Sequence, residues 1–453
     1  PQHVFREYDI RGVVETDLTP DFVRALGRGL GTMFRRAGAQ KVALGRDVRE
    51  SGERLRDDLA HGLRAVGCDV VDFGRLATPS FYHGCATGPE DAGIQITGSH
   101  NPPEFNGFKI VLHGLSFFGE QIQQTRQIMV DEDFETGEGS FSERPVTAAY
   151  IADLVAKADL ARPVRFAYDS GNGAAALVAA DVFAGISQEP VALFDEPDGT
   201  FPNHHPDPAV EENLEDLRQA VREGGLELGV AYDGDADRIG VIDDQGQVLW
   251  GDQLLILYAR DLLSRHPGAS VIFDVKCSQT LADAIERAGG QPIIWKTGHS
   301  LIKTKMKETK APLAGEMSGH MFFAEDYYGF DDAIYATLKL LEIVSRSEQP
   351  LSRMLADVPK MVSTPEIRVD CPDAIKFDVV RHVTDHFRSR YDVVDIDGVR
   401  VKFDAGWGLV RASNTQPALV VRVEATSEEH KNAYHAELTS AIDAATRATG
   451  DGG

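Results

Sequence analysis

The chain has 453 residues, which corresponds to about two to four domains and is enough to bury several hydrophobic cores. With 42% hydrophobic and 26% charged residues, the composition is that of a folded globular protein and excludes a disordered, fibrous or membrane protein. The net charge of −25 would repel nucleic-acid phosphates and anionic membranes, so an anionic substrate requires a local cluster of cationic side chains.

We expect a soluble, cytoplasmic protein. No apolar run approaches the roughly 18 residues of a transmembrane helix, and residues 1–11 contain no signal-peptide pattern. The four cysteines lie far apart and form no C-x-x-C pair, which indicates free buried thiols in a reducing compartment. They are Cys68, Cys85, Cys277 and Cys371.

Three segments repeat one pattern: an apolar strand that ends in a polar turn, a helix closed by Gly, and a second strand. The predicted strand pairs are 42–47 with 70–73, 165–169 with 191–194, and 270–274 with 292–295. Strands that alternate with helices predict mostly parallel sheets. The repeat spacing of roughly 110 residues is too long for a solenoid, so we predict three related α/β domains in series.

The last part of the chain breaks this pattern. A predicted helix at 375–390 leads into several strands within 391–425 and a closing helix from Ser427, which indicates an α+β domain. The predicted fold class is therefore α/β, with three related domains of mixed, mostly parallel sheets and a C-terminal α+β domain. The predicted domains are 1–145, 146–247, 248–360 and 361–453.

The segment 232–238 follows a predicted strand and carries three carboxylates at alternating positions, Asp233, Asp235 and Asp237. Three like charges in one turn are costly without a cation, so we interpret the segment as a metal loop rather than a solvated acidic turn. A calcium-binding EF-hand does not fit, because Arg238 stands where Gly is required and a strand precedes the loop. Mg²⁺ fits best, because it uses few carboxylates and leaves coordination positions for a phosphate oxygen.

Residues 94–103 form a predicted strand that ends in a turn bounded by Gly and Pro. Such a turn holds the hydroxyl of Ser99 stiffly at the end of the strand. Taken alone, the turn favours a capping role for Ser99, with His100 bonded to the backbone, over catalysis. A serine hydrolase is not supported, because the turn is not G-x-S-x-G and a neighbouring His in sequence does not have to reach the hydroxyl.

The segment 313–320 contains Glu316 and Ser318, which on an extended chain point the same way. A carboxylate beside a hydroxyl suits two adjacent hydroxyls of a sugar. The structural alternatives are a salt bridge for Glu316 and a buried core position for His320.

Cationic and hydroxyl side chains follow other predicted strands. In the turn 408–417, an arginine, two hydroxyls and an amide make a candidate anion cradle, although a polar turn is the simple alternative. Lys276 and the segment 296–299 come after strands, where α/β sheets bind ligands, although most lysines are only solvated. The residues of the turn are Arg411, Ser413, Asn414 and Thr415.

Together, and in this order, four motifs resemble those of the α-D-phosphohexomutases, closest to the bacterial phosphomannomutase/phosphoglucomutase branch. The motifs are residues 97–102, 233–238, 315–320 and 411–415. The resemblance covers essentially the whole chain, including 5–12 and 274–278, and four motifs in register are far more specific than any one of them. It implies four domains around a central cleft, each contributing one motif.

The resemblance also implies a role for each candidate. Ser99 is the phosphoserine, and Mg²⁺ is held by Ser99, Asp233, Asp235 and Asp237. Transition-state stabilisation or proton transfer falls to Arg11, His100, Lys109 and His320, among which the base is not identified. The residues implied in substrate binding are Tyr8, Arg238, Lys276, Gly298, His299, Glu316, Ser318, Arg411, Ser413, Asn414 and Thr415.

The implied reaction interconverts hexose 1-phosphate and hexose 6-phosphate, of mannose and glucose, through a 1,6-bisphosphate, with glucose 1,6-bisphosphate as activator. A phosphoserine carries about −1.5 to −2 charge, which agrees with Mg²⁺ and three aspartates beside it. The alternatives are a phosphoglucosamine mutase, in which Gln tends to stand at Met317, a Mg²⁺-dependent sugar phosphatase, and a non-catalytic sugar-phosphate-binding protein. We expect small sugar phosphates as partners and no nucleic acid, membrane or obligate protein partner.

Overall fold

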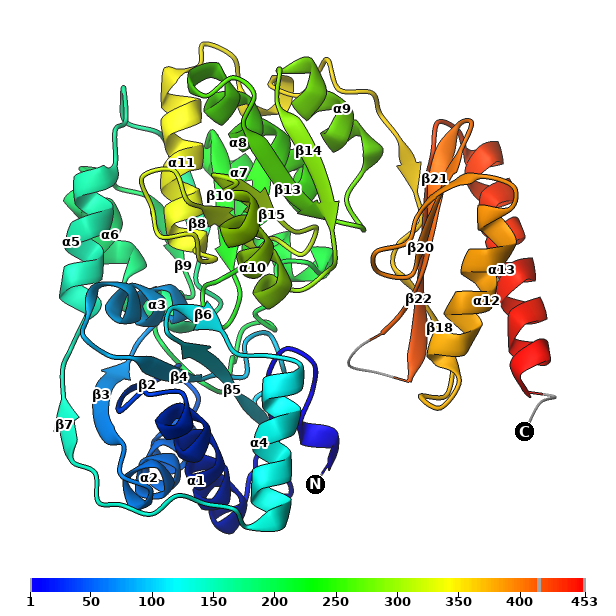
Figure 1. The fold of residues 1–453 in the computed structure, drawn as a ribbon. Helices are drawn as coiled ribbons and strands as arrows, with labels where there is room; N and C mark the ends of the chain where they lie inside the picture. Colours follow the sequence, from blue (N-terminus) through cyan, green and yellow to red (C-terminus); the bar gives the residue numbers. More distant parts are fainter. Residues whose placement is uncertain (1, 414–416, 451–453) are drawn as a thin grey trace.

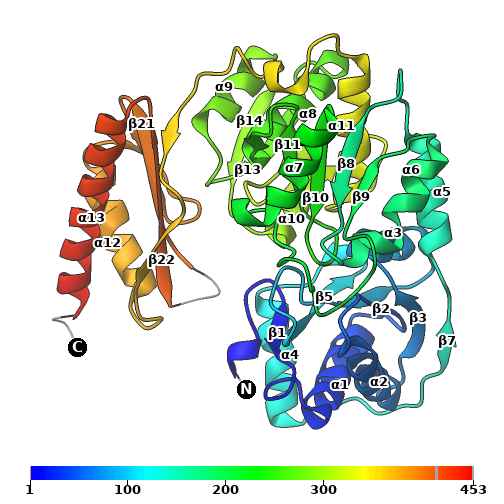
Figure 2. The same cartoon turned by 180° about the vertical axis from the view of Figure 1, so that it is seen from behind.

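The structure of the protein, a computed structural model, describes residues 2–413 and 417–450 and contains four β-sheets. In Figures 1 and 2 the first sheet lies below the second and third, and the fourth stands beside them. The predicted fold class is confirmed, because three α/β units are followed by one α+β unit. Every helix in the described ranges is too short or too polar to cross a membrane.

The first sheet has the strand order β1-β5-β4-β2-β3-β7, with β6 paired to β5. Strands β4, β2, β3 and β7 run parallel, β5 pairs antiparallel with β4, and β1 and β6 each pair antiparallel with β5. The strands are β1 (Ile10–Val13), β2 (Lys41–Arg46), β3 (Asp69–Arg75), β4 (Ala92–Ile96), β5 (Phe105–Leu112), β6 (Leu115–Ser116) and β7 (Phe141–Glu143). The helices of this unit are α1 (Pro20–Arg36), α2 (Gly52–Ala65), α3 (Thr78–Thr87) and α4 (Glu120–Asp131).

Helices cover both faces of the first sheet because side chains alternate along its strands. In β2, Val42 and Leu44 belong to the hydrophobic cluster shared with α1 and α2, whereas Ala43 belongs to the cluster that includes Phe81 of α3. The spacing of Leu55, Leu59, Leu63 and Val66 in the first repeat predicts one apolar helix face. All four side chains are fully buried, the three leucines in α2 and Val66 just after it.

The second sheet has the order β12-β11-β10-β8-β9. Its strands are β8 (Phe166–Asp169), β9 (Val191–Leu193), β10 (Leu228–Tyr232), β11 (Ile239–Asp243) and β12 (Val248–Leu249), and its helices are α5 (Thr147–Lys157), α6 (Ala179–Gly185) and α7 (Glu215–Gly224). The single helix expected between the two strands of the second repeat is divided into a 3₁₀ turn, Ala174–Leu177, and α6, because Val178 between them leaves the helical region with φ −142°.

The third sheet has the order β14-β13-β15-β16. Its strands are β13 (Ser270–Asp274), β14 (Gln291–Trp295), β15 (Leu313–Gly315) and β16 (Met321–Phe323), and its helices are α8 (Gly251–Arg265), α9 (Gln279–Arg287), α10 (His299–Thr309) and α11 (Ala333–Arg346). Capping side chains start two of these helices, because Ser278 accepts a hydrogen bond from the Thr280 amide and Asp332 accepts one from the Tyr335 amide.

The fourth sheet is antiparallel, in the order β17-β22-β21-β20-β19 with β18 paired to β22. Both of its helices lie on one face of the sheet (Figure 1). Its strands are β17 (Val362–Ser363), β18 (Ile367–Asp370), β19 (Asp392–Val394), β20 (Val399–Phe403), β21 (Gly406–Ala412) and β22 (Ala418–Ala425), and its helices are α12 (Lys376–Arg388) and α13 (Glu428–Gly450).

Candidate active site

The acidic loop joins β10 to β11, and its three carboxylates converge in the protein interior. Asp233, Asp235 and Asp237 are fully buried, and each has a carboxylate oxygen within 4.8 Å of the others. The loop closes on itself, because Asp233 Oδ1 accepts hydrogen bonds from the amides of Asp237 (3.0 Å) and Arg238 (3.1 Å). The structure thus brings together the three aspartates among the four predicted metal ligands.

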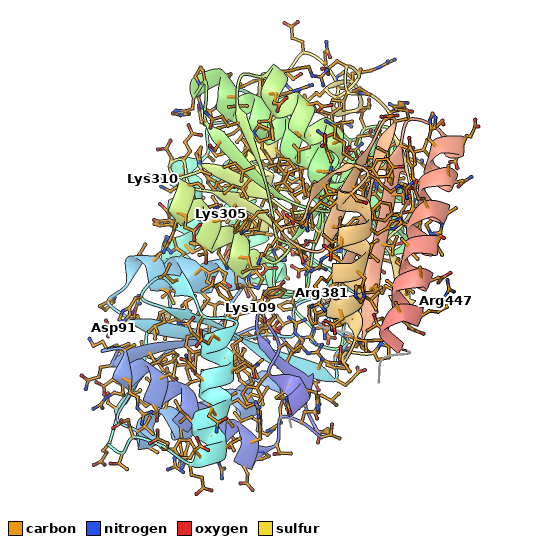
Figure 3. All side chains as sticks on the ribbon, turned by 45° about the vertical axis from the view of Figure 1, so that its right-hand side comes forward. Asp91, Lys109, Lys305, Lys310, Arg381 and Arg447 are labelled. Carbon is orange, nitrogen blue, oxygen red and sulfur yellow. The ribbon has the colours of Figure 1, made fainter. Side chains whose placement is uncertain are left out.

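Lys109 of β5 brings a positive charge to this loop from the first sheet. Its ammonium donates to Asp235 Oδ2 at 2.7 Å and also to Asp237. Figure 3 places it at the junction between the first sheet and the elements above. Burial would lower the pKa of Lys109, but Asp235 and Asp237 raise it well above its ordinary value. Burial and the other two carboxylates raise the pKa of Asp233, whereas Lys109 overcomes the effect of burial and lowers the pKa of Asp235.

Ser99 follows β4 and faces the acidic loop. Its Oγ donates to Asp233 Oδ2 at 2.8 Å and lies 3.2 Å from His100 Nδ1. Its backbone adopts the left-handed region with φ 48°, and its amide donates to Thr97 Oγ1 at 2.9 Å. Burial and the Arg238 guanidinium hold the pKa of His100, the ring beside the serine hydroxyl, well below its ordinary value.

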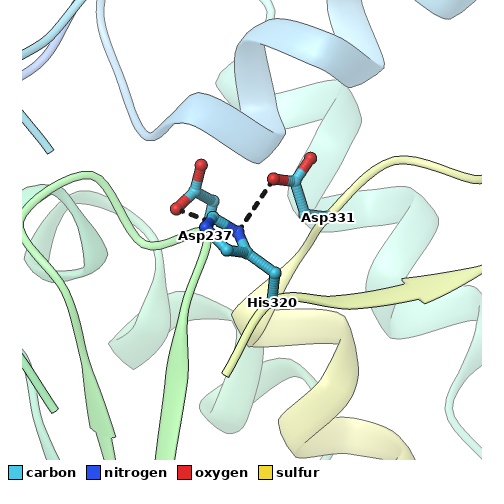
Figure 4. A group of neighbouring side chains, drawn as sticks. All are labelled: Asp237, His320 and Asp331. Carbon is cyan, nitrogen blue, oxygen red and sulfur yellow. Dashed lines mark ion pairs between the residues drawn. The ribbon is translucent and has the colours of Figure 1, made fainter. Parts of the chain in front are cut away.

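A second acidic group surrounds His320, which lies between Asp237 and Asp331 (Figure 4). His320 Nδ1 lies 3.0 Å from Asp331 Oδ2 and 3.6 Å from Asp237 Oδ1, and its Nε2 accepts a hydrogen bond from Arg238 Nε at 2.9 Å. Lys303 pairs with the other oxygen of Asp331 at 3.0 Å. Burial would raise the pKa of Asp331, but Lys303 and the two nearby histidines hold it well below its ordinary value.

The third motif lies beside this group. His299 stacks on His320 with ring centroids 5.6 Å apart, and Glu316 Oε1 accepts a hydrogen bond from the Gly298 amide at 2.5 Å. The expectation of an extended chain through Glu316 and Ser318 is wrong, because residues 317–318 form a turn closed by a 3.0 Å bond from the Gly319 amide to the Glu316 carbonyl. The alternation of side chains along a strand therefore gives no reason for Glu316 and Ser318 to point the same way.

Residues of the first, third and fourth domains meet around Thr297. The Tyr8 hydroxyl donates to the Thr297 carbonyl at 2.9 Å, and the Thr297 amide donates to Asp397 at 3.1 Å. The same carboxylate oxygen accepts a 3.0 Å bond from Arg411 Nε. Among the other predicted residues, Arg11 donates to Asn101 Oδ1 at 2.7 Å. Lys276 lies 3.5 Å from Glu366, and the Ser413 carbonyl accepts a hydrogen bond from Lys376. Asn414 and Thr415 lie outside the described residues.

Four family models match the chain in order. They are described as phosphoglucomutase/phosphomannomutase alpha/beta/alpha domains I, II and III, at residues 2–136, 148–246 and 250–362, and the C-terminal domain of that family, at 366–441. The chain belongs to the phosphoglucomutase/phosphomannomutase family. The family predicted from the motifs is thereby confirmed, and with it the prediction that the chain is a hexose phosphate mutase.

Relatives of the family cover nearly the whole chain. A Pseudomonas putida phosphomannomutase/phosphoglucomutase is 45% identical over 429 residues, which span 94% of this chain and 93% of the relative. A phosphoglucomutase from Neisseria gonorrhoeae is 43% identical over 430 residues, again 94% and 93% of the two chains. The crystal structure of a family protein from Burkholderia thailandensis superposes with a TM-score of 0.92 at 43% identity, covering 98% of both chains.

The chemistry of this family member's acidic loop fits a hard divalent cation. Among the described residues, Asp235 Oδ1 and Asp237 Oδ1 are buried and have no hydrogen-bond partner. Buried carboxylate oxygens left in this way are the ligands that Mg²⁺ uses. The group around His320 fits a second cation less well, because Lys303 and Arg238 already supply positive charge there.

Several residues that build this phosphohexomutase site were not predicted from the sequence. Asp331 contacts His320 and Asp397 contacts Arg411, whereas Lys303 contacts Asp331. Thr78 Oγ1 donates to Asp235 Oδ2 at 2.6 Å. The pair Asp331-Asp332 after Gly329 carries one local signal, because an acidic residue before an apolar helix is typical of an N-cap. No comparable sequence pattern marks the other three residues, Lys303, Asp397 and Thr78.

We predict that Gly234→Ala lowers kcat by about 10²-fold, since a reacting group displaced by about 1 Å costs that much. A Cβ at Gly234 would lie 2.4 Å from the Ser99 carbonyl oxygen. The segment 97–105 around Ser99, called the serine loop below, would therefore have to move away from the acidic loop. The matched control is Gly52→Ala at the start of α2, where the nearest atom lies at 3.4 Å. Equal kcat for Gly234→Ala and the unsubstituted enzyme would contradict the prediction.

Proposed function

We propose that the enzyme interconverts the 1-phosphates and 6-phosphates of mannose and glucose through phosphorylated Ser99 and a hexose 1,6-bisphosphate. The observation that carries this proposal is the 2.8 Å hydrogen bond from Ser99 Oγ to Asp233, inside a buried group that also holds Asp235, Asp237 and Lys109. A hydroxyl in that environment is placed to exchange a phosphoryl group whose charge the surroundings compensate.

In the first half of the reaction, the free hydroxyl of the bound hexose phosphate attacks the phosphorus on Ser99. A bond forms from that hydroxyl oxygen to phosphorus, the bond from phosphorus to Ser99 Oγ breaks, and the hydroxyl proton passes to a base. We propose that Arg11, His100, Lys109 and His320 stabilise the transferring group or carry this proton.

In the second half, the bisphosphate reorients and returns its other phosphate to Ser99. The binding groups must then accept either end of the intermediate. We propose that the distal phosphate lies against Arg411, Ser413, Asn414 and Thr415, and that Glu316 and Ser318 bind the O3 and O4 hydroxyls. Contacts to those hydroxyls do not distinguish configuration at C2, where glucose and mannose differ. The remaining substrate contacts in this proposal are Tyr8, Arg238, Lys276, Gly298 and His299, around a cleft between the four domains.

We propose that Mg²⁺ is held by Asp233, Asp235 and Asp237 together with an oxygen of the Ser99 phosphate. When bound, it neutralises charge on the transferring phosphoryl group. Glucose 1,6-bisphosphate would act as activator by phosphorylating Ser99. A cytoplasmic location accords with the cysteines, all of which are free thiols. The proposed domain limits are those predicted from the sequence.

The test is ³¹P NMR of the enzyme with Mg²⁺, a trace of glucose 1,6-bisphosphate and, in turn, the 1-phosphates of glucose, mannose and glucosamine. Conversion of the first two to 6-phosphates at comparable rates is the expected result. Conversion of glucosamine 1-phosphate alone would identify a phosphoglucosamine mutase instead. Release of inorganic phosphate as the main product would identify a phosphatase, and an unchanged spectrum with every sugar would contradict the proposal.

Removal of the divalent cation is expected to abolish turnover reversibly. Dialysis against a chelator leaves three buried carboxylates beside the phosphoserine, and their repulsion opposes transfer. In the same ³¹P assay, we expect no conversion after dialysis and full recovery when Mg²⁺ is added. Undiminished turnover in the chelated enzyme would exclude a metal role for the acidic loop.

A further inference from the structure

Arg49 lies beneath the serine loop and binds four of its carbonyl oxygens. Its Nη2 donates to the carbonyls of Ser99 (2.8 Å) and Asn101 (2.5 Å), and its Nη1 donates to those of Pro102 (2.6 Å) and Phe105 (2.9 Å). Arg49 is only 3% exposed, so these bonds form in the protein interior. A planar guanidinium with several donors suits this arrangement, whereas a lysine ammonium would supply one donor centre.

Asp47, two residues earlier, binds the other arm of the same loop. Its Oδ2 accepts hydrogen bonds from Thr97 Oγ1 at 2.8 Å and from the Gly98 amide at 3.3 Å. Its Oδ1 accepts one from the Arg49 amide at 2.9 Å, and the two side chains form an ion pair at 3.3 Å. Asp47 and Arg49 therefore connect the residues that enter the serine turn with those that leave it.

The turn requires such support, because Ser99 occupies the left-handed region that L-residues rarely adopt. Its carbonyl, which Arg49 binds, also lies against Gly234 of the acidic loop. The Arg49 guanidinium lies over the ring of Phe201, 5.1 Å from its centroid, so the second domain covers it. Movement of Arg49 would release the backbone that aims Ser99 Oγ at Asp233.

We propose that Arg49 and Asp47 are positioning residues for phosphoryl transfer, which hold the Ser99 loop in its strained conformation without contacting the transferred group. This inference rests on the proposed function, because it gives the loop a reacting serine to hold. Arg49 binds backbone carbonyls rather than substrate, so its loss acts on the geometry of transfer and leaves substrate binding in place.

The test compares Arg49→Lys, Arg49→Met and Asp47→Asn with the control Arg54→Met. Arg54 belongs to the same domain but donates to the carbonyl of Leu18, far from the serine loop in sequence. We expect the Arg49 variants to lower kcat by about 10²-fold with KM almost unchanged, since a displaced reacting group loses rate rather than substrate binding. The rate at which glucose 1,6-bisphosphate phosphorylates Ser99, followed by intact mass, should fall in parallel, while Arg54→Met stays at the unsubstituted rate.

Hydrogen–deuterium exchange supplies a readout that needs no substrate. We expect Arg49→Lys and Asp47→Asn to raise amide exchange in residues 97–105 and to leave α1 and α2 protected. Unchanged exchange in that loop, or an unchanged kcat in Arg49→Lys, would overturn the proposal. Loss of amide protection throughout the first domain in both Arg49→Lys and Asp47→Asn would mean that Arg49 and Asp47 have a general structural role, and this result would also overturn the proposal. Failure of the unsubstituted enzyme to turn over any sugar phosphate would contradict the proposed function. The exchange experiment needs no substrate, so its result tests the support of the serine loop separately.

Discussion

Ser99→Ala is expected to abolish mutase turnover, with kcat lowered by at least about 10³-fold, because the proposed mechanism carries the phosphoryl group on Ser99 between the two halves of the reaction. The removed hydroxyl is the one that donates to Asp233 at 2.8 Å. The same ³¹P assay with glucose 1-phosphate measures this loss. Intact mass after incubation with glucose 1,6-bisphosphate should show no phosphorylated protein.

The matched control for this substitution is Ser264→Ala. The Ser264 hydroxyl is exposed and donates to the Asp261 carbonyl at 2.7 Å, so its removal should leave kcat unchanged. Mg²⁺ binding by Ser99→Ala, measured by calorimetry, should persist, because all three acidic ligands remain. Phosphorylation of the Ser99→Ala protein at another residue, with turnover retained, would show that the phosphoryl carrier has been misassigned.

The fold could be predicted from the sequence to a large extent because its signals are local. Leu55, Leu59 and Leu63 mark a helix face by spacing alone, and Ser278 marks a helix start by its capping side chain. Topology then explains why two motifs meet. Ser99 and Asp233 each follow a strand with a parallel neighbour, β4 and β10, and polar residues at such strand ends form the sites of α/β proteins.

The residues that escaped prediction act through partners far away in the sequence. Arg49 follows a strand and reads as an ordinary surface arginine, yet it binds carbonyls more than fifty residues away. Lys109 lies within the apolar strand β5, and only the family resemblance singled it out. Its partners Asp235 and Asp237 lie in the loop between two strands of another sheet, β10 and β11, and no local pattern reports how two sheets face one another.

The error at Ser318 has a different origin. Spacing of two residues aligns side chains only in a strand, and the strand ends at Gly315. Gly319 then adopts φ +96°, and a Cβ there would lie 2.4 Å from the Ile239 carbonyl oxygen. Gly319 was therefore the local signal for a turn, because a glycine at this point is suited to a positive φ, and it could have corrected the expectation.

Lys109→Met is expected to lower kcat by about 10²-fold or more and, at the same time, to strengthen Mg²⁺ binding. The ammonium donates to Asp235 and Asp237, so it competes with a metal for their charge. Without it, two buried carboxylates are uncompensated, which costs about 3–5 kcal/mol of stability in the absence of metal. Mg²⁺ should restore part of that loss. Calorimetry of Mg²⁺ binding and thermal unfolding with and without Mg²⁺ measure the two effects.

The control is Lys402→Met, on an exposed position of β20 in the fourth domain, which should change neither quantity. The sign of the change in Mg²⁺ affinity decides what Lys109 does. Tighter binding with lower kcat means that the ammonium offsets the carboxylates when the metal is absent and acts on the phosphoryl group during transfer. Weaker binding in Lys109→Met would mean instead that the ammonium holds Asp235 and Asp237 in place for the metal. In that case the loss of kcat would be recovered at saturating Mg²⁺, because the bound metal would itself hold Asp235 and Asp237 in place.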